Sequence, residues 1–340
     1  MAGPGVRPAE RHETMNPTTA TATGGPVVDV ATMAPPRLRW DELPETVRAA
    51  AESALGAGVA SDVTQAGGFS PGLASRLVLD DGRRVFAKAI NTARNPRSPG
   101  LYRREIEVMA ALPESVPAPR LRWSFDDGDW VMLVLDDVEG TIPVQPWDRR
   151  EFARVLAALE ALSDALTPAP ITAMSIVDDL AENFRSWHTI ADDPALTGRL
   201  DQWTQANLAR LVEQESGWAA AAAGDTLLHA DLRADNLLLT ADGVMVVDWP
   251  YAVTGARWVD ALLFLPSVAA TSSIDPEQAW TGFRPARDAD PDAVNAVLTA
   301  VAGDFLYQSM LPAPANLPTL RAHQHEKGAA ALAWLRDRIS

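Results

Sequence analysis

Residues 229–249 carry the strongest structural signal in this chain. They begin with His229-Ala230-Asp231-Leu232-Arg233-Ala234-Asp235-Asn236 and end with Val246-Val247-Asp248-Trp249. Two short apolar runs, 236–239 and 244–247, flank residues 240–243 and predict a strand, a turn and a second strand. A compact loop brings Asn236 back beside Asp231, and the hairpin returns Asp248 to the same place.

Two carboxylates and an amide gathered in this way suit phosphoryl transfer. An acceptor hydroxyl needs a carboxylate that orients it and takes its proton, and Asp231 is the candidate. The phosphates of a nucleotide need Mg²⁺, which prefers carboxylate and amide oxygens such as those of Asn236 and Asp248. No covalent intermediate is required, because positioning and charge stabilisation are sufficient.

The motif resembles the catalytic loop H-x-D-x-x-x-x-N of the protein-kinase-like fold. The segment Val246–Trp249 resembles the metal-binding aspartate of the aminoglycoside phosphotransferase family, in which Asp-Trp often replaces D-F-G. The resemblance covers residues 59 to 265 and implies a bilobal α+β fold, with a small β-rich N-lobe and a larger helical C-lobe. It also implies ATP or GTP as donor and Mg²⁺ as cofactor. His229 is expected to hold the loop by packing rather than to react.

A glycine-rich segment follows the first predicted strand, 59–65. It resembles the short phosphate loop of small-molecule kinases, whose backbone N–H groups cover the nucleotide. A plain glycine turn is the alternative. The candidate nucleotide-binding residues in it are Gly67, Gly68, Ser70 and Gly72.

Lys88 lies in an apolar run, Val85–Ile90, that resembles the V-A-I-K strand of kinases. Only Lys88 and Lys327 are lysines, and the other 27 of the 29 basic residues are arginines. A compact ammonium suits a phosphate pair better than a guanidinium, so Lys88 is the expected phosphate ligand. Glu105 borders the apolar stripe of the predicted helix 101–112 and is its expected partner, with a solvated surface charge as the alternative.

Three further features complete the expected site. The run Val134, Leu135 and Asp136 resembles the hinge whose main chain holds the adenine ring. Arg233 follows Asp231 by two residues and is placed to steady the transferred phosphoryl group, with a plain surface arginine as the alternative. Asp260 resembles the aspartate of the family that supports the catalytic loop through backbone N–H groups.

The interval from Asp248 to Asp260 is only twelve residues and holds no A-P-E motif. Protein kinases place a longer segment there, which docks peptide substrates. The acceptor is therefore expected to be a small hydroxylated molecule. An antibiotic is the leading expectation, and the alternatives are a metabolic amino alcohol, sugar or amino acid, nucleotidyl transfer, or a non-catalytic nucleotide-binding pseudokinase.

The remaining patterns set the domain limits. A disordered tail rich in Pro, Gly and Thr is expected over 1–38. The nucleotide-binding N-lobe is expected over 39–140, and the C-lobe, with the catalytic loop and the acceptor site, over 141–340. Strands are predicted at 75–79, 83–90, 121–125 and 130–135. Helices are predicted from Pro44 to Gly56 or Gly58 and over 152–166, 200–222, 292–306 and 317–339.

The composition excludes several classes of protein. Of the 340 residues, 29 are Lys or Arg and 45 are Asp or Glu, so the net charge is −16. This balance disfavours nucleic-acid and polybasic membrane binding, which need clustered cations, and it is compatible with a cationic acceptor. The absence of cysteine excludes disulfides and fits a cytoplasmic location. No apolar run approaches the ~18 residues of a membrane helix.

Overall fold

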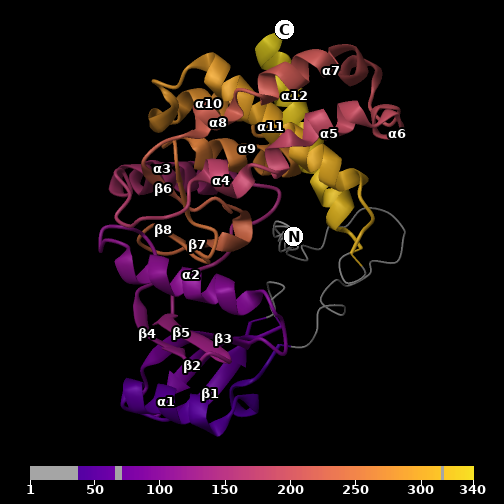
Figure 1. Cartoon of the computed structure of the whole chain (residues 1–340). Helices are drawn as coiled ribbons and strands as arrows, with labels where there is room; N and C mark the ends of the chain where they lie inside the picture. Colours follow the sequence, from indigo (N-terminus) through magenta and orange to yellow (C-terminus); the bar gives the residue numbers. More distant parts are fainter. Residues whose placement is uncertain (1–36, 66–70, 315–317) are drawn as a thin grey trace, which may run out of the picture.

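The computed structural model describes residues 37–65, 71–314 and 318–340, and shows a smaller sheet-containing lobe below a larger helical one (Figure 1). The N-lobe sheet is antiparallel, with strand order β1-β2-β3-β5-β4. Its strands are β1 (Val59–Thr64), β2 (Leu73–Leu79), β3 (Arg84–Asn91), β4 (Leu121–Asp126) and β5 (Trp130–Asp136). All five lie close to their predicted positions. Gly67, Gly68 and Ser70 lie outside the described residues.

Alternation along the strands gives the sheet two apolar faces. Ala87 and Ala89 of β3 pack in a cluster with helix α1 (Glu45–Leu55). Leu133 of β5 belongs to the other cluster, which includes helix α2 (Ser98–Ala111) and most of the C-lobe core. Because Lys88 alternates with Ala87 and Ala89, its side chain lies on the face that α2 covers.

The C-lobe is mostly helical. Its helices are α3 (Arg149–Ala165), α4 (Ile176–Leu180), α5 (Ser186–Asp192), α6 (Pro194–Thr197), α7 (Gln202–Glu215), α8 (Trp218–Ala222), α9 (Val259–Thr271), α10 (Pro276–Gly282), α11 (Pro291–Met310) and α12 (Leu320–Ile339). Short 3₁₀ turns occupy Trp40–Glu42 in the N-lobe and Asn183–Arg185, Ala234–Asn236 and Arg284–Ala286 in the C-lobe. Helices α11 and α12 pack side by side (Figure 1).

Two small two-stranded sheets lie within the C-lobe. The predicted pair is β7 (Leu237–Leu239) with β8 (Val244–Val246), and its turn closes through the Thr240 amide, which donates to the Gly243 carbonyl over 2.9 Å. The second pair, β6 (Thr226–Leu228) with β9 (Val253–Gly255), was not predicted, because the whole segment from His229 to Ala252 separates its strands and no short turn joins them.

The connection between the lobes joins the β7–β8 pair. Thr141 and Leu239 exchange two main-chain hydrogen bonds, of 3.0 and 2.8 Å. The sheet of the N-lobe ends at Asp136, so residues 137–140 alone separate the two pairing systems.

Two expectations differ from the structure. The single helix predicted over 200–222 is wrong, since α7 ends at Glu215 and α8 begins at Trp218. Ser216 and Gly217 interrupt the helix, and glycine is a poor helix former. Leu38, placed in the tail, is instead buried at 3% exposure and pairs with Leu73 of β2.

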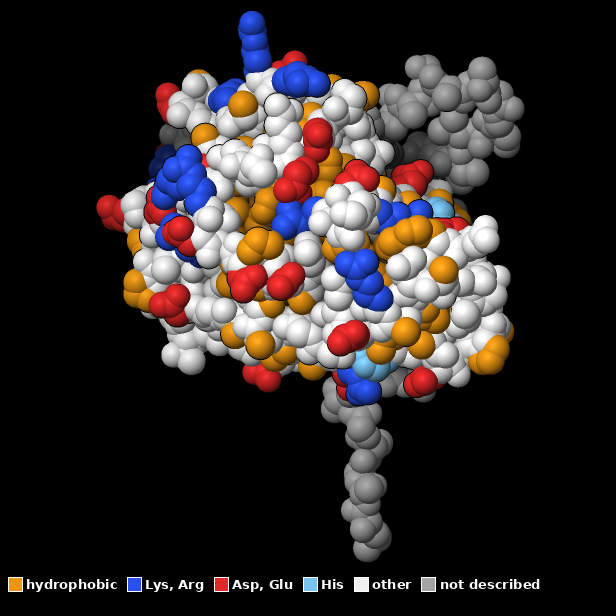
Figure 2. Space-filling view, turned by 90° about the horizontal axis from the view of Figure 1, so that it is seen from above, with side chains coloured by type: hydrophobic (Ala, Val, Ile, Leu, Met, Phe, Trp, Pro, Cys, Tyr) orange, Lys and Arg blue, Asp and Glu red, His pale blue; other side chains and the backbone are white. Residues whose placement is uncertain are grey.

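The described surface is of mixed charge. On the face seen in Figure 2, acidic and basic side chains of the described residues are interspersed among neutral and apolar ones. None of the helices in the described part of the chain combines the length and apolar character needed to cross a bilayer.

Gly72 marks a close approach between two strands of the sheet. A Cβ atom at this position would lie 2.2 Å from the Ala89 carbonyl oxygen and 3.0 Å from the Ile90 side chain. The backbone of Gly72 also accepts a 3.3 Å hydrogen bond from the Leu38 amide. The absence of a side chain is therefore required by the packing of β2 against β3.

We expect Gly72→Ala to lower the free energy of unfolding by about 1–3 kcal/mol, because β2 and β3 must separate to admit the methyl group. Urea denaturation measures the change. Gly100→Ala is the matched control, since nothing lies within 4 Å of a Cβ there, and this substitution within α2 should be neutral or stabilising. Equal stability of the two variants would contradict the packing role of Gly72.

Candidate active site

Lys88 lies between two carboxylates that come from separate elements. Its Nζ is 2.7 and 2.9 Å from the two oxygens of Glu105 on α2. It is also 2.7 Å from Oδ1 of Asp248, which follows β8. The three side chains are 14%, 1% and 36% exposed, so the salt bridge to Glu105 is almost fully desolvated.

The charges in this cluster shift one another. Burial lowers the pKa of the Lys88 ammonium, but Asp248, Glu105 and Tyr102 raise it, and the net shift is upward. For Asp248, burial acts to raise the pKa, while Lys88 lowers it and prevails. Burial dominates at Glu105 and raises its pKa against the opposing effect of Lys88. Lys88 thus stays a cation, and Asp248 stays an anion that can meet a metal ion.

The catalytic loop is held by Asp260, near the start of α9. Its Oδ2 accepts the His229 amide and its Oδ1 accepts the Ala230 amide, each over 2.8 Å. Ala230 adopts a left-handed φ of 60°, which costs a non-glycine residue about 1–3 kcal/mol. The two amides that Asp260 accepts, those of His229 and Ala230, hold the backbone in this conformation.

His229 packs under the loop. Its ring is fully buried and lies edge-on to Trp249, with centroids 4.8 Å apart. Nδ1 accepts the Asp231 amide over 3.3 Å, which leaves Nε2 to donate to the Val247 carbonyl over 3.0 Å. This pattern fixes the neutral Nε2–H tautomer, and burial lowers the pKa of the ring accordingly.

Asn236 reaches back to Asp231 as the spacing predicts. Its Nδ2 donates to the Asp231 main-chain oxygen over 2.7 Å and to Oδ2 of that carboxylate over 3.3 Å. The amide of Val247 donates to the Asn236 carbonyl over 3.0 Å, which places Asp248 next to Asn236. Because the amide nitrogen is held by Asp231, the orientation of the Asn236 side chain is fixed and its Oδ1 points away from that residue.

This donor set fits Mg²⁺. One carboxylate and one amide oxygen are a sparse set, and Mg²⁺ bound with a nucleotide takes its remaining ligands from phosphates and water. The described residues hold no group of three or more acidic, histidine or cysteine side chains that would form a complete protein cage. Asp248 has a left-handed φ of 67°, a strained conformation that marks it as a positioned residue.

Arg233 is buried within the loop rather than exposed on the surface. Its Nε and Nη2 each lie 3.0 Å from an oxygen of Asp235, and its Nη1 lies 3.5 Å from Oδ1 of Asp231. Its side chain is 7% exposed. The guanidinium therefore holds the shape of the loop and contributes positive charge beside Asp231.

The expected hinge residues differ among themselves. Val134 and Leu135 lie inside β5, between β3 and β4, so the sheet flanks their backbone on both sides. Asp136 ends the strand, where its amide donates to the Arg120 carbonyl over 3.0 Å and its carboxylate pairs with Arg122. Residues 137–140 are the part of the connection between the lobes that belongs to neither sheet.

A cavity of about 890 Å³, including its open mouth, lies in the C-lobe beside the catalytic loop. Ala230, Asp231 and Arg233 form one wall, and residues of the 176–185 segment and of α9, α11 and α12 form the rest. Since Asp231 belongs both to the catalytic loop and to this wall, a molecule in the cavity meets its carboxylate.

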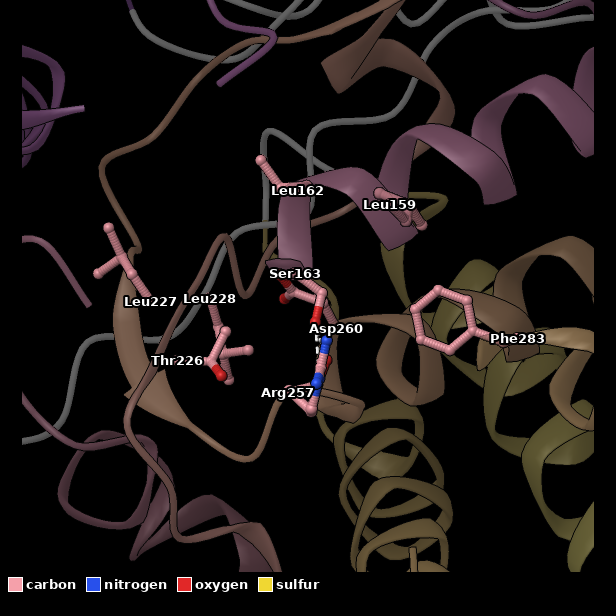
Figure 3. Close-up of a pocket in the computed structure, with 9 residues that line it drawn as sticks. All are labelled: Leu159, Leu162, Ser163, Thr226, Leu227, Leu228, Arg257, Asp260 and Phe283. Atoms are coloured by element: carbon pink, nitrogen blue, oxygen red, sulfur yellow. Dashed lines mark hydrogen bonds between the residues drawn. The ribbon is translucent and has the colours of Figure 1, made fainter. Parts of the chain in front are cut away.

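A smaller hollow of about 260 Å³ lies within the C-lobe core, and Asp260 is part of its lining. Figure 3 shows Leu159 and Phe283 on one side of the Ser163–Arg257 pair and the β6 residues on the other. Its lining is mainly apolar, and within it the Ser163 hydroxyl donates to the Arg257 carbonyl over 3.1 Å. This hollow belongs to the support of the loop.

Sequence reasoning missed several contributors. Asp235 lies inside the motif but was not recognised as the partner of Arg233. The Trp249 amide donates to Glu105, and a backbone donor leaves no signal in a sequence. Arg37 is a further cation near the cluster: burial lowers its pKa, while Tyr102 and Asp248 act to raise it. Tyr102 lies one turn before Glu105 on the same face of α2, and this spacing could have indicated that Tyr102 also lies near the Lys88 cluster.

The comparisons with known proteins agree with this geometry. The model of the phosphotransferase enzyme family (APH) matches residues 67–297. None of the curated proteins matches the chain. Among solved structures, a thermostable mutant of aminoglycoside phosphotransferase APH(4)-Ia in complex with AMP-PNP and hygromycin B has a TM-score of 0.52 at 17% identity, covering 86% of this chain and 98% of that one.

Two other solved structures are similar. A choline/ethanolamine kinase family protein from Mesorhizobium loti has a TM-score of 0.51 at 16% identity, covering 85% of this chain and 94% of that one. Macrolide 2'-phosphotransferase type I has a TM-score of 0.50 at 18% identity, covering 85% and 95%. At these identities the likeness shows the fold, which is the bilobal protein-kinase-like α+β fold. The family match covers more than half of the chain, which therefore belongs to the phosphotransferase enzyme family and is a small-molecule O-phosphotransferase.

Proposed function

We propose that this chain transfers the γ-phosphoryl group of ATP to a hydroxyl of a small molecule bound in the cavity beside Asp231. One observation carries the proposal: Asp231 lines the cavity and is tied through Asn236 to the segment that ends in Asp248. The acceptor side and the metal side of the reaction therefore meet at one loop. Complexes of similar structures with ADP or AMP-PNP support a nucleotide donor.

In this proposal each residue has one task. Asp231 accepts a hydrogen bond from the acceptor hydroxyl and takes its proton as the oxygen attacks phosphorus. The bond between the γ-phosphorus and the β–γ bridging oxygen breaks, and ADP leaves. Lys88 binds the α- and β-phosphates, and Glu105 holds the Lys88 ammonium in place. Gly72 borders the nucleotide. The sheet pairs the backbone of the expected hinge residues Val134 and Leu135 on both sides, so residues 137–140 would offer main chain to the adenine ring in their place.

Asn236 and Asp248 are the residues that would hold Mg²⁺. The ion supplies positive charge to the phosphates when it is bound. Arg233 adds a fixed positive charge beside Asp231, in a site where burial strengthens its effect. His229 and Asp260 hold the loop and touch no reacting atom.

The shared fold does not fix the class of acceptor. Proteins that share the fold are named as aminoglycoside and macrolide phosphotransferases and as a choline/ethanolamine kinase family protein. An antibiotic acceptor, the leading expectation from the sequence, stays a prediction. Mass spectrometry of the product distinguishes the reactions, because phosphoryl transfer adds one phosphate and nucleotidyl transfer adds one nucleotide.

Asp231→Asn should reduce turnover about 10²–10⁴-fold, because the amide cannot take the proton of the acceptor. Calorimetric titration with AMP-PNP and Mg²⁺ should show nucleotide affinity near that of the wild type. Asp242→Asn, an exposed residue in the β7–β8 turn, is the control and should keep full activity. Near-wild-type turnover by Asp231→Asn would remove Asp231 as the base.

Asp248→Asn should abolish most of the Mg²⁺ dependence of nucleotide binding, since the neutral amide is a weaker ligand than the carboxylate. Asparagine tolerates the left-handed φ at this position better than alanine does, so the backbone is kept. Nucleotide titrations with and without Mg²⁺ measure the effect. The same metal dependence in variant and wild type would show that Asp248 is only a turn residue.

Lys88→Arg should raise KM for ATP about tenfold or more, although the charge is kept. The planar guanidinium is larger than the ammonium and does not fit 2.7 Å from both Glu105 and Asp248. Steady-state kinetics and a thermal melt test this. Arg103→Lys, in the half-exposed pair with Asp126, is the control and should change little. A fully active and equally stable Lys88→Arg enzyme would refute Lys88 as the phosphate ligand.

A further inference from the structure

The N-lobe sheet carries two arginines on the face that also carries Lys88. Arg84 and Lys88 are four residues apart on β3, so their side chains lie on the same face of the sheet. Arg76 of β2 is the direct partner of Phe86 on β3, which places it on this face as well. A strand rises about 3.3 Å per residue, so Arg84 and Lys88 lie about 13 Å apart along β3.

Asp137, the first residue after β5, is held between these two arginines. Its Oδ2 lies 2.8 Å from Nη2 of Arg84, and its Oδ1 lies 3.3 Å from Nε of Arg76. The Asp137 side chain is 3% exposed, whereas the residue as a whole is only half-buried, so its accessible part is mostly main chain. A carboxylate that is so fully desolvated needs paired cations, and the two arginines supply them.

Arg76 also holds the main chain of the next residue. Its Nη2 donates to the Val138 carbonyl over 3.2 Å, so one guanidinium contacts both the side chain of Asp137 and the backbone of Val138. Among the residues described by the structure, none donates a hydrogen bond to Oδ1 of Asp137, so the ion pair with Arg76 compensates the burial of this oxygen. Residues 137 and 138 are therefore fixed to the sheet of the N-lobe.

The other end of the connection is attached to the C-lobe. A Cβ atom at Gly140 would lie 3.0 Å from the Leu239 carbonyl oxygen, and Thr141 exchanges its two main-chain hydrogen bonds with Leu239. Glu139, between the two attachments, is exposed. The main chain that could meet a base is thus anchored separately on each side, and its N-lobe anchor is the contact of Asp137 with the two arginines.

We propose that Asp137 and Arg76 are positioning residues for the donor nucleotide, which hold the main chain of residues 137 and 138 where it meets the base while Lys88 binds the phosphates. The inference rests on the proposed function, in which residues 137–140 offer main chain to the adenine ring. Because Arg84 and Lys88 belong to one strand, the ion pair fixes the distance between the base site and the phosphate site. Neither Asp137 nor Arg76 needs to touch the nucleotide.

Displacement of the fluorescent nucleotide mant-ADP tests the two halves of the nucleotide site separately and needs no acceptor. Adenosine reports on the base site, and tripolyphosphate with Mg²⁺ reports on the phosphate site. In Asp137→Asn the Kd of adenosine should rise about tenfold, because the neutral amide no longer holds the backbone between two guanidiniums. The Kd of tripolyphosphate should change by less than about twofold. Equal weakening of both ligands, or unchanged binding of adenosine, would overturn the positioning role.

Arg76→Gln tests the same contact from the other partner and keeps the pair of Arg84 with Asp137, so it decides the question if Asp137→Asn does not fold. It should also weaken adenosine selectively. In the double variant the loss should be smaller than the product of the two single losses, since both changes remove one shared interaction. Asp164→Asn is the matched control, because this aspartate also lies between two arginines, Arg257 and Arg284, but in the C-lobe. Its Kd values should equal those of the wild type.

The same assay separates this inference from the proposed function. Lys88→Arg should show the reverse pattern, with weaker binding of tripolyphosphate and little change for adenosine, since it alters the phosphate site alone. A wild type that binds tripolyphosphate but not adenosine would overturn the base site beside residues 137 and 138 and leave the role of Lys88 intact. A wild type that binds no mant-ADP would contradict the proposed function, and the inference with it.

Discussion

A single ammonium, that of Lys88, holds together three parts of the chain that are distant in sequence. It lies 2.7 Å from Glu105 on α2 and 2.7 Å from Asp248 at the end of the C-lobe hairpin. Two carboxylates in so little solvent would repel each other strongly without a cation between them. Through these two contacts the Lys88 side chain links the sheet both to α2 and to the C-lobe. A contact from the Trp249 amide to Glu105 closes the cluster from the C-lobe side.

The catalytic loop is likewise held by a few side chains. Both carboxylate oxygens of Asp260 accept hydrogen bonds from backbone amides of the loop. These bonds hold Ala230 in a left-handed conformation that is unfavourable for alanine. His229 holds the other side through a defined tautomer. None of these groups needs to touch a substrate. Their effect is that Asp231 and Asn236 arrive at fixed positions before any ligand binds, which is the preorganisation that phosphoryl transfer requires.

The residues that sequence alone located are those whose chemistry is unusual for their surroundings. Lys88 is a lysine in an apolar strand, and Glu105 is an acid at the edge of an apolar helix face, so each was expected to have a partner. Their contact required only that β3 and α2 pack together. The N-lobe strands were predicted equally well, because alternation and Asp-Gly turns are local signals.

Other features depend on contacts that no local pattern encodes. The β6–β9 pair consists of three-residue strands from opposite ends of the catalytic segment, and the break after Glu215 depends on one glycine in a strongly helical run. The cavity was not foreseen, because its walls come from the catalytic loop and from α11 and α12, about 70 to 90 residues later. The net charge of the chain, −16, is a property of the whole sequence. A global composition averages over a surface and says little about one wall of one site.

The bonds between Thr141 and Leu239 have a mechanical meaning. They attach the inter-lobe connection to the hairpin that follows Asn236, so the connection is held in place on the C-lobe side. On the other side the chain is part of β5 up to Asp136. A pivot within the connection itself would fall in residues 137–140, and the lobes are linked at a second point by the Val246 amide, which donates to the Pro117 carbonyl over 2.7 Å. Rotation about it would stretch the bond from Lys88 to Asp248 and the one from Trp249 to Glu105, while the Lys88–Glu105 pair would travel as a unit. The two lobes would then separate between Lys88 and Asp248. The N-lobe would keep the Lys88–Glu105 pair, and the C-lobe would keep Asp248.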